Sequence, residues 1–170
     1  MEFKPFVYDR DNTQIPISIE KMTQSDAELT NSDPVWQTAW TSEYLRDDRI
    51  EKYAAKAGKE LVALGAYEIL ESSLIVRIVY LEVHPESNPT MDGGDPKYTG
   101  IGRVMIAFGI KMSIDYGFTG DVVLEAKTTA LAKHYERDFG AVRLPGFPSS
   151  APRYLIADEA AKRIFFTYLS

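Results

Sequence analysis

The sequence predicts an α/β (α+β) fold with a mixed, mostly antiparallel sheet flanked by helices. Two observations predict this fold class. Three apolar, strand-like runs follow one another between residues 50 and 84 and are separated by short turn signals, which indicates an antiparallel meander. A helical pattern then links the last of these runs to another strand-like run, which indicates a parallel pair joined by a crossover helix. A meander joined to such a unit gives a mixed sheet.

The N-terminal residues predict two short strands and two short helices. Residues 3–8 and 15–21 have strand-like patterns, and Pro16 favours an edge position for the second strand. Ser25 is a suitable N-cap for a short helix. Pro34 suits the first position of another helix. Aromatic side chains share one side of that second helix, where they either pack in the core or line a pocket: Trp36, Trp40 and Tyr44.

The central residues predict a β-hairpin followed by a third strand. Residues 50–57 and 60–70 are the two hairpin strands, with Gly58 at the turn. Alanine residues in the first of these strands leave a helix open as the alternative. The third strand covers residues 74–84. It is followed by a Gly- and Pro-rich segment, residues 86–96, which predicts a mobile surface loop.

A glycine turn, Lys97-Tyr98-Thr99-Gly100-Ile101-Gly102, stands directly before a helical pattern. Apolar residues recur there at three- and four-residue spacing up to the stop at Gly117. A helix N-terminus presents N–H groups without intrahelical acceptors and the positive end of a dipole, which suits an anion such as phosphate. The turn differs from a P-loop, which needs lysine where Arg103 stands, and from a dinucleotide fingerprint, which needs glycine where Met105 stands.

The C-terminal residues predict a strand, a helix and further short elements. Residues 121–126 form the strand that is parallel to the end of the meander, and a helix follows with Thr128 or Thr129 as its cap. The end of that helix contains Tyr135-Glu136-Arg137-Asp138-Phe139-Gly140. After it we expect a strand over residues 141–144, a loop over 145–152, a helical turn over 158–163 and a last strand over 164–169.

The stretch from Leu81 through Gly102 resembles the acetyl-CoA site of the GCN5-related N-acetyltransferases. That family has Arg or Gln, two residues, Gly, one residue and then Gly or Ala, after a strand that ends like Leu81-Glu82-Val83-His84-Pro85. The first position of the pattern is Lys97 in this chain, and the preceding loop is longer than is usual. The motif from Tyr135 to Gly140 resembles the family's next motif. The resemblance covers residues 50–144 well.

The resemblance implies one domain over residues 1–170 that transfers an acetyl group from acetyl-CoA to an amine. It implies that backbone N–H groups hold the pyrophosphate and polarise the thioester carbonyl. The implied cofactor-binding residues are Leu81, Val83, Lys97, Tyr98, Thr99, Gly100, Ile101, Gly102 and Arg103. Tyr135 is implied as the general acid, because a phenol is mostly protonated at neutral pH. Glu82 is the candidate base, with His84 and Glu68 as alternatives.

Composition restricts the function further. The chain has 170 residues, 45% of them hydrophobic and 26% charged, with no cysteine, two histidines and a formal net charge of -6. These values suit one globular domain, exclude disulfides and cysteine zinc sites, and argue against nucleic-acid binding, which needs clustered Lys and Arg. No apolar run reaches membrane-spanning length and the N-terminus lacks a signal-peptide pattern, so we expect a cytoplasmic protein without a metal or membrane partner.

Three points are left open by the sequence. The acceptor is a small-molecule or peptide amine of unidentified structure, and a homodimer is compatible with the chain. A catalytically degenerate CoA-binding or interaction module is an alternative function, because Lys97 and the long loop depart from the family pattern. A second alternative is an unrelated binding protein with a mixed sheet, in which the glycine turn has only a structural role.

Overall fold

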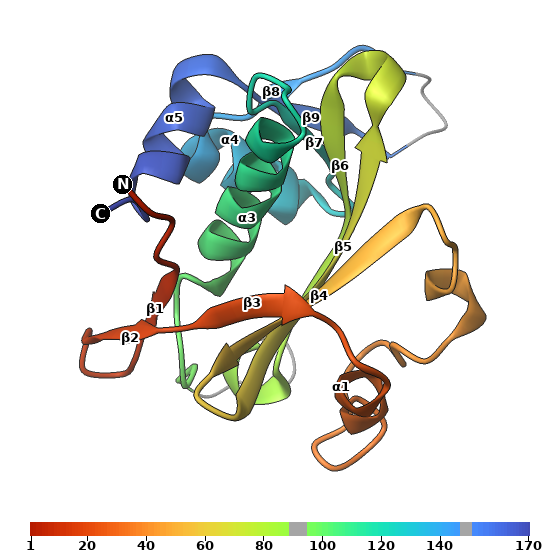
Figure 1. The fold of residues 1–170 in the computed structure, drawn as a ribbon, viewed down its shortest axis with the longest axis vertical. Helices are drawn as coiled ribbons and strands as arrows, with labels where there is room; N and C mark the ends of the chain where they lie inside the picture. Colours follow the sequence, from red (N-terminus) through yellow and green to blue (C-terminus); the bar gives the residue numbers. More distant parts are fainter. Residues whose placement is uncertain (89–94, 147–150) are drawn as a thin grey trace. The chain divides into compact units, whose positions relative to one another are not determined.

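The computed structural model describes residues 1–88, 95–146 and 151–170 of the chain, apart from the side chain of Tyr44. Seven strands form one sheet in the order β3-β4-β5-β6-β7-β9-β8, and β1 pairs with β2 separately (Figure 1). The strands are β1 (Phe6–Tyr8), β2 (Gln14–Pro16), β3 (Ser18–Lys21), β4 (Ile50–Ala57), β5 (Glu60–Leu70), β6 (Ile75–Val83), β7 (Val122–Glu125), β8 (Val142–Arg143) and β9 (Arg153–Ile156). The helices are α1 (Gln24–Leu29), α3 (Ile101–Asp115), α4 (Thr129–Phe139) and α5 (Asp158–Phe166), with 3-10 turns at Glu43–Leu45, Glu71–Ser73 and Pro85–Ser87.

The predicted fold class is confirmed by the strand directions. β6 and β7 are parallel, and the pairs β3–β4, β7–β9 and β8–β9 are antiparallel. The parallel pair is the predicted strand, crossover helix and strand, because α3 lies between β6 and β7 in the chain. The sheet is therefore mixed, with helices among the elements that connect its strands.

The chain divides into two compact units. Unit 1 comprises Met1–Phe3, Tyr67–Val79 and Met105–Ser170, and unit 2 comprises Lys4–Ala66 and Tyr80–Val104. β5 and β6 contribute residues to both units, and α3 begins in unit 2 and continues in unit 1. The single domain over the whole chain stays a prediction.

The hairpin predicted at the centre of the chain is confirmed, including the bounds of both strands. β4 ends at Ala57 and β5 begins at Glu60, so residues 50–57 form a strand and not the alternative helix. Gly58 at the turn has a φ of +62°, a backbone conformation that residues other than glycine rarely adopt. The predicted strand over residues 15–21 is interrupted at Ile17, whose N–H donates to the Pro5 carbonyl at 3.1 Å.

The first helix of unit 2 is capped by Thr23 and not by Ser25. The Thr23 hydroxyl accepts from the Asp26 N–H at 3.1 Å, and the Asp26 carboxylate accepts from the Thr23 N–H at 2.9 Å. This reciprocal pair satisfies two backbone donors at the start of α1. The cap lies two residues earlier than predicted because Asp26 can reach back to Thr23 from the third helical position.

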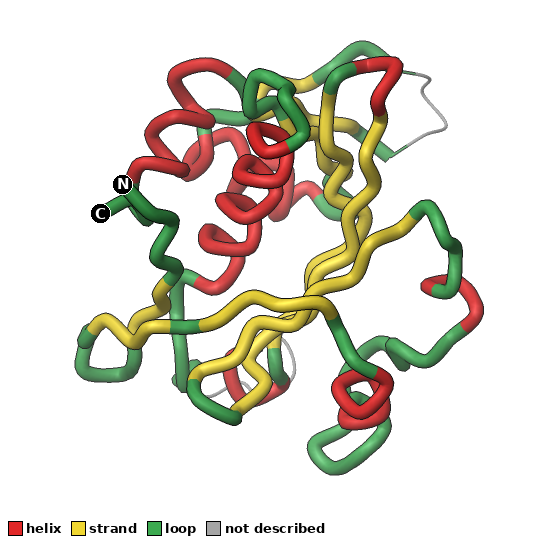
Figure 2. The backbone as a smooth tube through the Cα atoms, viewed as in Figure 1, coloured by secondary structure: helices red, strands yellow, loops and turns green. Residues whose placement is uncertain are grey.

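The prediction of a helix that begins at Pro34 is wrong. Residues 31–42 form a loop, drawn green in Figure 2. The Gln37 and Thr38 N–H groups in this loop donate to the Glu82 carboxylate, so a side chain on a distant strand takes the place of helical acceptors. Trp36 and Trp40 are only 5% and 2% exposed, so they pack in the core of unit 2, one of the two places considered for them.

Unit 1 contains the predicted helix α4 with both of its caps. The Thr128 hydroxyl accepts from the Leu131 N–H at 3.1 Å, and Gly140 ends the helix with a φ of +63°. α3 packs closely in the same unit, because a Cβ added at Gly109 would lie 3.3 Å from both Ile78 and Tyr67. Glycine at this position therefore permits the close approach of helix and sheet.

Two predictions for the last twenty residues need correction. The strand β9 was not predicted, although Tyr154 and Ile156 are buried with the alternation typical of a strand. The predicted strand over residues 164–169 is wrong, since α5 continues to Phe166. Ala161 and Ile164 are buried at helical spacing, which a strand could not place on one face.

Candidate functional site

The glycine turn and the first turn of α3, which we predicted to bind an anion, lie together in unit 2. Gly100 has a φ of +79°, which requires glycine, and the first bond of the helix joins the Val104 N–H to the Gly100 carbonyl at 3.2 Å. The N–H groups of Ile101 and Gly102 precede that bond and so have no acceptor within the helix. A Cβ at Gly102 would meet no atom within 4 Å, so open space lies beside these donors. The geometry suits a phosphate group.

The first three residues of the turn use their N–H groups within unit 2. The Lys97 N–H donates to the Glu86 carbonyl at 3.1 Å, and the Thr99 N–H donates to the Tyr8 carbonyl at 2.8 Å. The Tyr98 N–H donates to the buried Ser87 hydroxyl at 3.0 Å. Of the residues predicted to bind through backbone N–H groups, Gly100, Ile101 and Gly102 are therefore better placed than Tyr98 and Thr99. The Arg103 side chain is half-buried.

Glu60 holds the side chains of two consecutive residues of the turn. One of its oxygens lies 2.7 Å from the Lys97 Nζ, and the other accepts from the Tyr98 hydroxyl at 3.3 Å. A carboxylate oxygen of Glu86 also lies near this amine, 3.9 Å from the Lys97 Nζ. The hydrogen bond to Glu60 raises the pKa of Lys97. The positive charge of Lys97 is thus paired, and nothing in the sequence around Lys97 indicates Glu60, 37 residues earlier, as its partner.

The end of β6 contains Leu81 and Val83, whose N–H groups are predicted to polarise the thioester carbonyl, and that role stays a prediction. The His84 N–H donates to the Val62 carbonyl of β5 at 2.9 Å. Because backbone N–H groups alternate in direction along a strand, those of Leu81 and Val83 point to the edge opposite β5. The parallel register with β7 covers only Val76 to Ile78, whereas β6 continues to Val83.

Glu82, the candidate base, is a buried hydrogen-bond acceptor in unit 2. It is 4% exposed. One carboxylate oxygen accepts from the Gln37 N–H at 2.7 Å and the Thr38 N–H at 3.4 Å, and the other accepts from the Trp40 indole at 2.9 Å. Hydrogen bonds of this kind compensate a buried charge. The carboxylate therefore fixes the loop at residues 36–40, and its role as a base stays a prediction.

Tyr80 of β6 and His84, which follows the strand, contact the same loop as Glu82. The Tyr80 hydroxyl lies 2.9 Å from the Thr38 hydroxyl, and the His84 ring lies edge-on to Trp36 at 5.7 Å. The alternative bases have partners as well. His84 Nδ1 accepts from the Glu86 N–H at 3.1 Å, while Glu68 in unit 1 pairs with Arg77 at 3.2 Å.

Tyr135, the candidate acid, lies on α4 in unit 1 and is half-buried. Its ring packs edge-on against the Tyr154 ring, with the two ring centroids 6.2 Å apart. The centroid of the Phe139 ring lies 6.3 Å away. Burial raises the pKa of the Tyr135 phenol, with no hydrogen bond or charge contributing. The hydroxyl is therefore protonated at neutral pH and can donate a proton.

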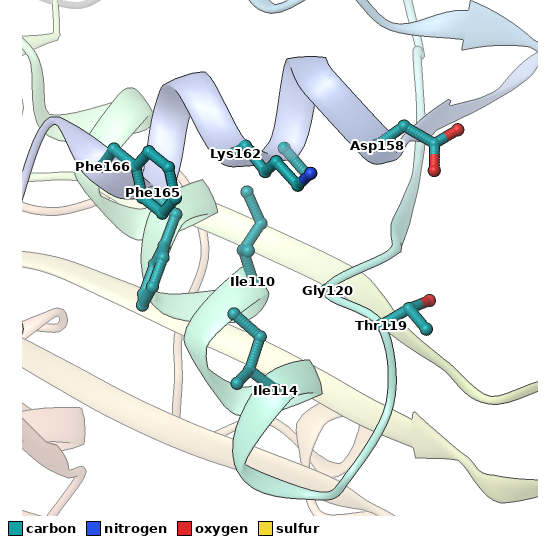
Figure 3. Close-up of a pocket in the computed structure, with 9 residues that line it drawn as sticks. Ile110, Ile114, Thr119, Gly120, Asp158, Lys162, Phe165 and Phe166 are labelled. Carbon is teal, nitrogen blue, oxygen red and sulfur yellow. The ribbon is translucent and has the colours of Figure 1, made fainter.

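A pocket of about 370 Å³ lies in unit 1 between α3 and α5 (Figure 3). Ile110 and Ile114 of α3 face Phe165 of α5, and Asp158 and Lys162 stand along α5 at the same pocket. None of the predicted site residues lines it. Within the described parts of the chain, no cluster of three or more His, Asp and Glu side chains could hold a metal ion, and no helix is long and apolar enough to cross a membrane.

The loop over residues 86–96 is only partly described. Pro85–Ser87 forms a 3-10 turn, and Asp95 and Pro96 lead into the glycine turn. The prediction of a mobile excursion falls on residues 89–94, which lie outside the described residues.

No protein-family model and no curated protein matches the sequence. Solved structures do match the fold. The GNAT domain of S. lividans PAT has a TM-score of 0.61 at 14% identity, over 92% of this chain and 97% of that chain. Aminoglycoside acetyltransferase AAC(6')-Ib in complex with coenzyme A and kanamycin has a TM-score of 0.57 at 13% identity, over 86% of this chain and 98% of that chain. A Bacillus subtilis acetyltransferase in complex with CoA has a TM-score of 0.52 at 16% identity, over 84% of this chain and 97% of that chain.

Proposed function

Because this chain has the fold of the GCN5-related N-acetyltransferases, we propose that it transfers an acetyl group from acetyl-CoA to a primary amine. The observation that carries the proposal is the glycine turn. Ile101 and Gly102 present two N–H donors at the start of α3 beside open space, which is the arrangement that a pyrophosphate needs. Two of the similar structures contain CoA, which supports acetyl-CoA as the co-substrate.

The chemistry requires a polarised carbonyl and two proton transfers. The amine nitrogen attacks the thioester carbonyl carbon, the carbon–sulfur bond breaks, and the departing thiolate takes up a proton. We assign carbonyl polarisation to the Leu81 and Val83 N–H groups at the end of β6. We assign protonation of the thiolate to the Tyr135 hydroxyl. Glu82 is the candidate for the proton that the amine loses.

The acceptor is an amine of a small molecule or a peptide. The net charge of -6 is compatible with a cationic acceptor. The similar AAC(6')-Ib structure contains kanamycin, so aminoglycosides belong in an acceptor screen beside amino acids, polyamines and peptide N-termini. Release of free CoA thiol from acetyl-CoA in the presence of any of these amines would support the proposed acetyltransferase activity.

A CoA-binding module without turnover is the second candidate function. Its supporting observation is the pairing of Lys97 with Glu60, which removes a free positive charge from the first position of the phosphate motif. The two candidates differ in one result, because the module binds acetyl-CoA but releases no thiol with any amine of the panel.

The central test is Gly102→Asp with acetyl-CoA titrated calorimetrically. A carboxylate there occupies the open space and repels the pyrophosphate, while its charge suits a helix N-terminus and leaves the fold intact. We expect affinity to fall about 100-fold, or about 3 kcal/mol. Gly146→Asp is the matched control, since a Cβ at Gly146 also meets nothing within 4 Å. Equal acetyl-CoA affinity in both variants would contradict the proposed site.

A further inference from the structure

The N-terminal hairpin contacts the segment that leads into the glycine turn. Figure 1 shows β1 beside the loop that enters α3. Tyr8 and Thr99 exchange two main-chain hydrogen bonds, with the Tyr8 N–H to Thr99 carbonyl distance at 3.0 Å and the reverse distance at 2.8 Å. Arg10 Nη2 donates to the Asp95 carbonyl at 3.0 Å. The hairpin therefore contacts both ends of the segment from Asp95 to Thr99.

The Tyr8 side chain adds a third contact, at the glycine itself. A Cβ built on Gly100 would lie 3.5 Å from Tyr8 Cδ2, so the ring stands at van der Waals distance from the turn. Phe6 supports this ring edge-on, with the two centroids 5.5 Å apart. Val7, between them, is completely buried and anchors the strand in unit 2.

The hairpin is closed by a compact turn, which makes it a firm support. The Asp9 carboxylate accepts from the Asp11 and Thr13 N–H groups, both at 2.9 Å, and the Asp9 N–H donates to the Thr13 carbonyl at 3.0 Å. Asn12 completes the turn with a φ of 60°, a conformation that asparagine tolerates well. An aspartate that bonds its own following backbone limits the motion of a turn.

We propose that the hairpin from Phe6 to Pro16 is a positioning element of the phosphate site, with Tyr8 and Arg10 as its positioning residues. By holding the Thr99 backbone, it directs the Ile101 and Gly102 N–H groups to the pyrophosphate of acetyl-CoA. This inference rests on the proposed function. The energetic benefit is that donors fixed before binding cost no ordering when the ligand arrives.

The test compares the double variant Tyr8→Ala/Arg10→Ala with wild type in two measurements. Calorimetric affinity for acetyl-CoA should fall about tenfold, as expected for the loss of one or two restraining contacts. Amide hydrogen exchange at Thr99 should quicken at least about tenfold, since local opening becomes easier. Tyr8→Phe and Arg10→Lys keep the ring and the donor, so together they should restore both values. The melting temperature should change little.

Arg49→Ala is the matched control, because Arg49 is an exposed arginine of the same unit that pairs with Asp47 at 2.7 Å, a residue remote in sequence from the turn. Wild-type affinity in the Tyr8/Arg10 double variant, with affinity lost in Gly102→Asp, would overturn the hairpin's role and leave the proposed function standing. Normal affinity in Gly102→Asp would instead overturn the phosphate site and with it any role for the hairpin in binding. Fast Thr99 exchange in the wild type would also overturn the proposal.

Discussion

At the scale of single residues, the candidate catalytic acid, Tyr135, and the candidate base, Glu82, differ in their surroundings. Burial raises the pKa of the Tyr135 phenol, and among the described residues no hydrogen bond or charge contributes to that shift. Glu82 instead accepts three N–H groups from one loop. Removing the hydroxyl of Tyr135 should therefore affect chemistry, whereas changing the carboxylate of Glu82 should affect stability.

Tyr135→Phe keeps the ring and its packing against Tyr154 and Phe139. We expect the free energy of unfolding to change by about 1 kcal/mol or less and turnover to fall on the order of 10²-fold, with acetyl-CoA affinity unchanged. The acid acts only while protonated. Since its pKa is raised, wild-type activity that depends on it should persist to a pH above about 10, the ordinary value for tyrosine.

Single-turnover kinetics at several pH values, together with urea unfolding, would measure these effects. Wild-type turnover in Tyr135→Phe, with the chemical step rate-limiting, would assign Tyr135 to packing. A loss of several kcal/mol in stability would lead to the same assignment, because the hydroxyl would then be a buried structural partner.

Glu82→Gln replaces one accepting oxygen by an NH2 group that faces an N–H donor. We expect this variant to lose about 1–3 kcal/mol of stability, since a buried donor is left without its acceptor. Glu20→Gln on β3 is the control, because Glu20 is exposed. Chemical unfolding of both variants measures the difference. A Glu82→Gln protein as stable as wild type but without activity would favour the role as base.

At the scale of elements, α1 depends on one buried carboxylate. Asp26 bonds Thr23 at the cap, and its Oδ1 lies 2.8 Å from the Lys56 Nζ of β4. Burial raises the pKa of Asp26, but hydrogen bonds from Lys56 and Thr23 outweigh burial, so the pKa lies below its ordinary value. A six-residue helix is too short to be stable alone, so these bonds tie it to the sheet.

The stability that Asp26 contributes should depend on pH. Because its folded pKa is lowered, the contribution is full above the unfolded value of about 4 and disappears as the pH falls through the folded pKa. Asp26→Ala should cost about 2 kcal/mol at pH 7 and much less in acid. Urea unfolding across pH 2–7 tests this, with the exposed Glu28→Ala in the same helix as control. An equal cost at all pH values would show that the charge is not responsible.

At the scale of the whole molecule, the two ends of the chain are joined within unit 1. Glu2 and Ser170 exchange main-chain hydrogen bonds of 3.0 and 3.1 Å, and Figure 1 shows both termini together. Phe3 stacks on Phe165 at 5.9 Å and lies edge-on to Tyr168 at 6.1 Å. The first three residues are therefore part of the unit that α5 completes.

Phe3→Ala should destabilise unit 1 by about 2 kcal/mol, through lost burial and two lost ring contacts. Phe166→Ala is the matched control, because Phe166 is 60% exposed and should cost less than about 0.5 kcal/mol. Thermal unfolding followed by near-UV circular dichroism compares the two variants. Equal costs for both would mean that the N-terminal contact is not a stabilising one.

The sequence predicts those elements whose pattern is local. The hairpin over residues 50–70, α3 and α4 follow from periodicity, turn residues and caps that lie within a few positions of one another. The fold expected from the two motifs is confirmed by solved structures. The loop at residues 31–42 was predicted wrongly because its N–H acceptor is Glu82, 45 residues after Gln37.

The same distinction holds for the candidate site. The glycine turn was predicted because glycines directly before a helical pattern are a local feature. Glu60 and Tyr8 could not be predicted, since their contacts with Lys97 and Thr99 arise only when strands distant in sequence come together. Their residue types alone, a carboxylate at the start of β5 and an aromatic at the end of β1, are equally typical of ordinary surface positions.

The hydrogen bonds made by the first three N–H groups of the glycine turn have a thermodynamic consequence. The conformational entropy of Lys97, Tyr98 and Thr99 is lost during folding, at a cost of about 1–2 kcal/mol for each backbone residue. The acetyl-CoA proposed to bind here would meet a segment already ordered by folding, so its association would need no slow rearrangement of this segment and its binding enthalpy would be opposed by little ordering of the chain. Folding would thus order the binding segment in advance, and the entropy lost on binding would be mainly that of the ligand.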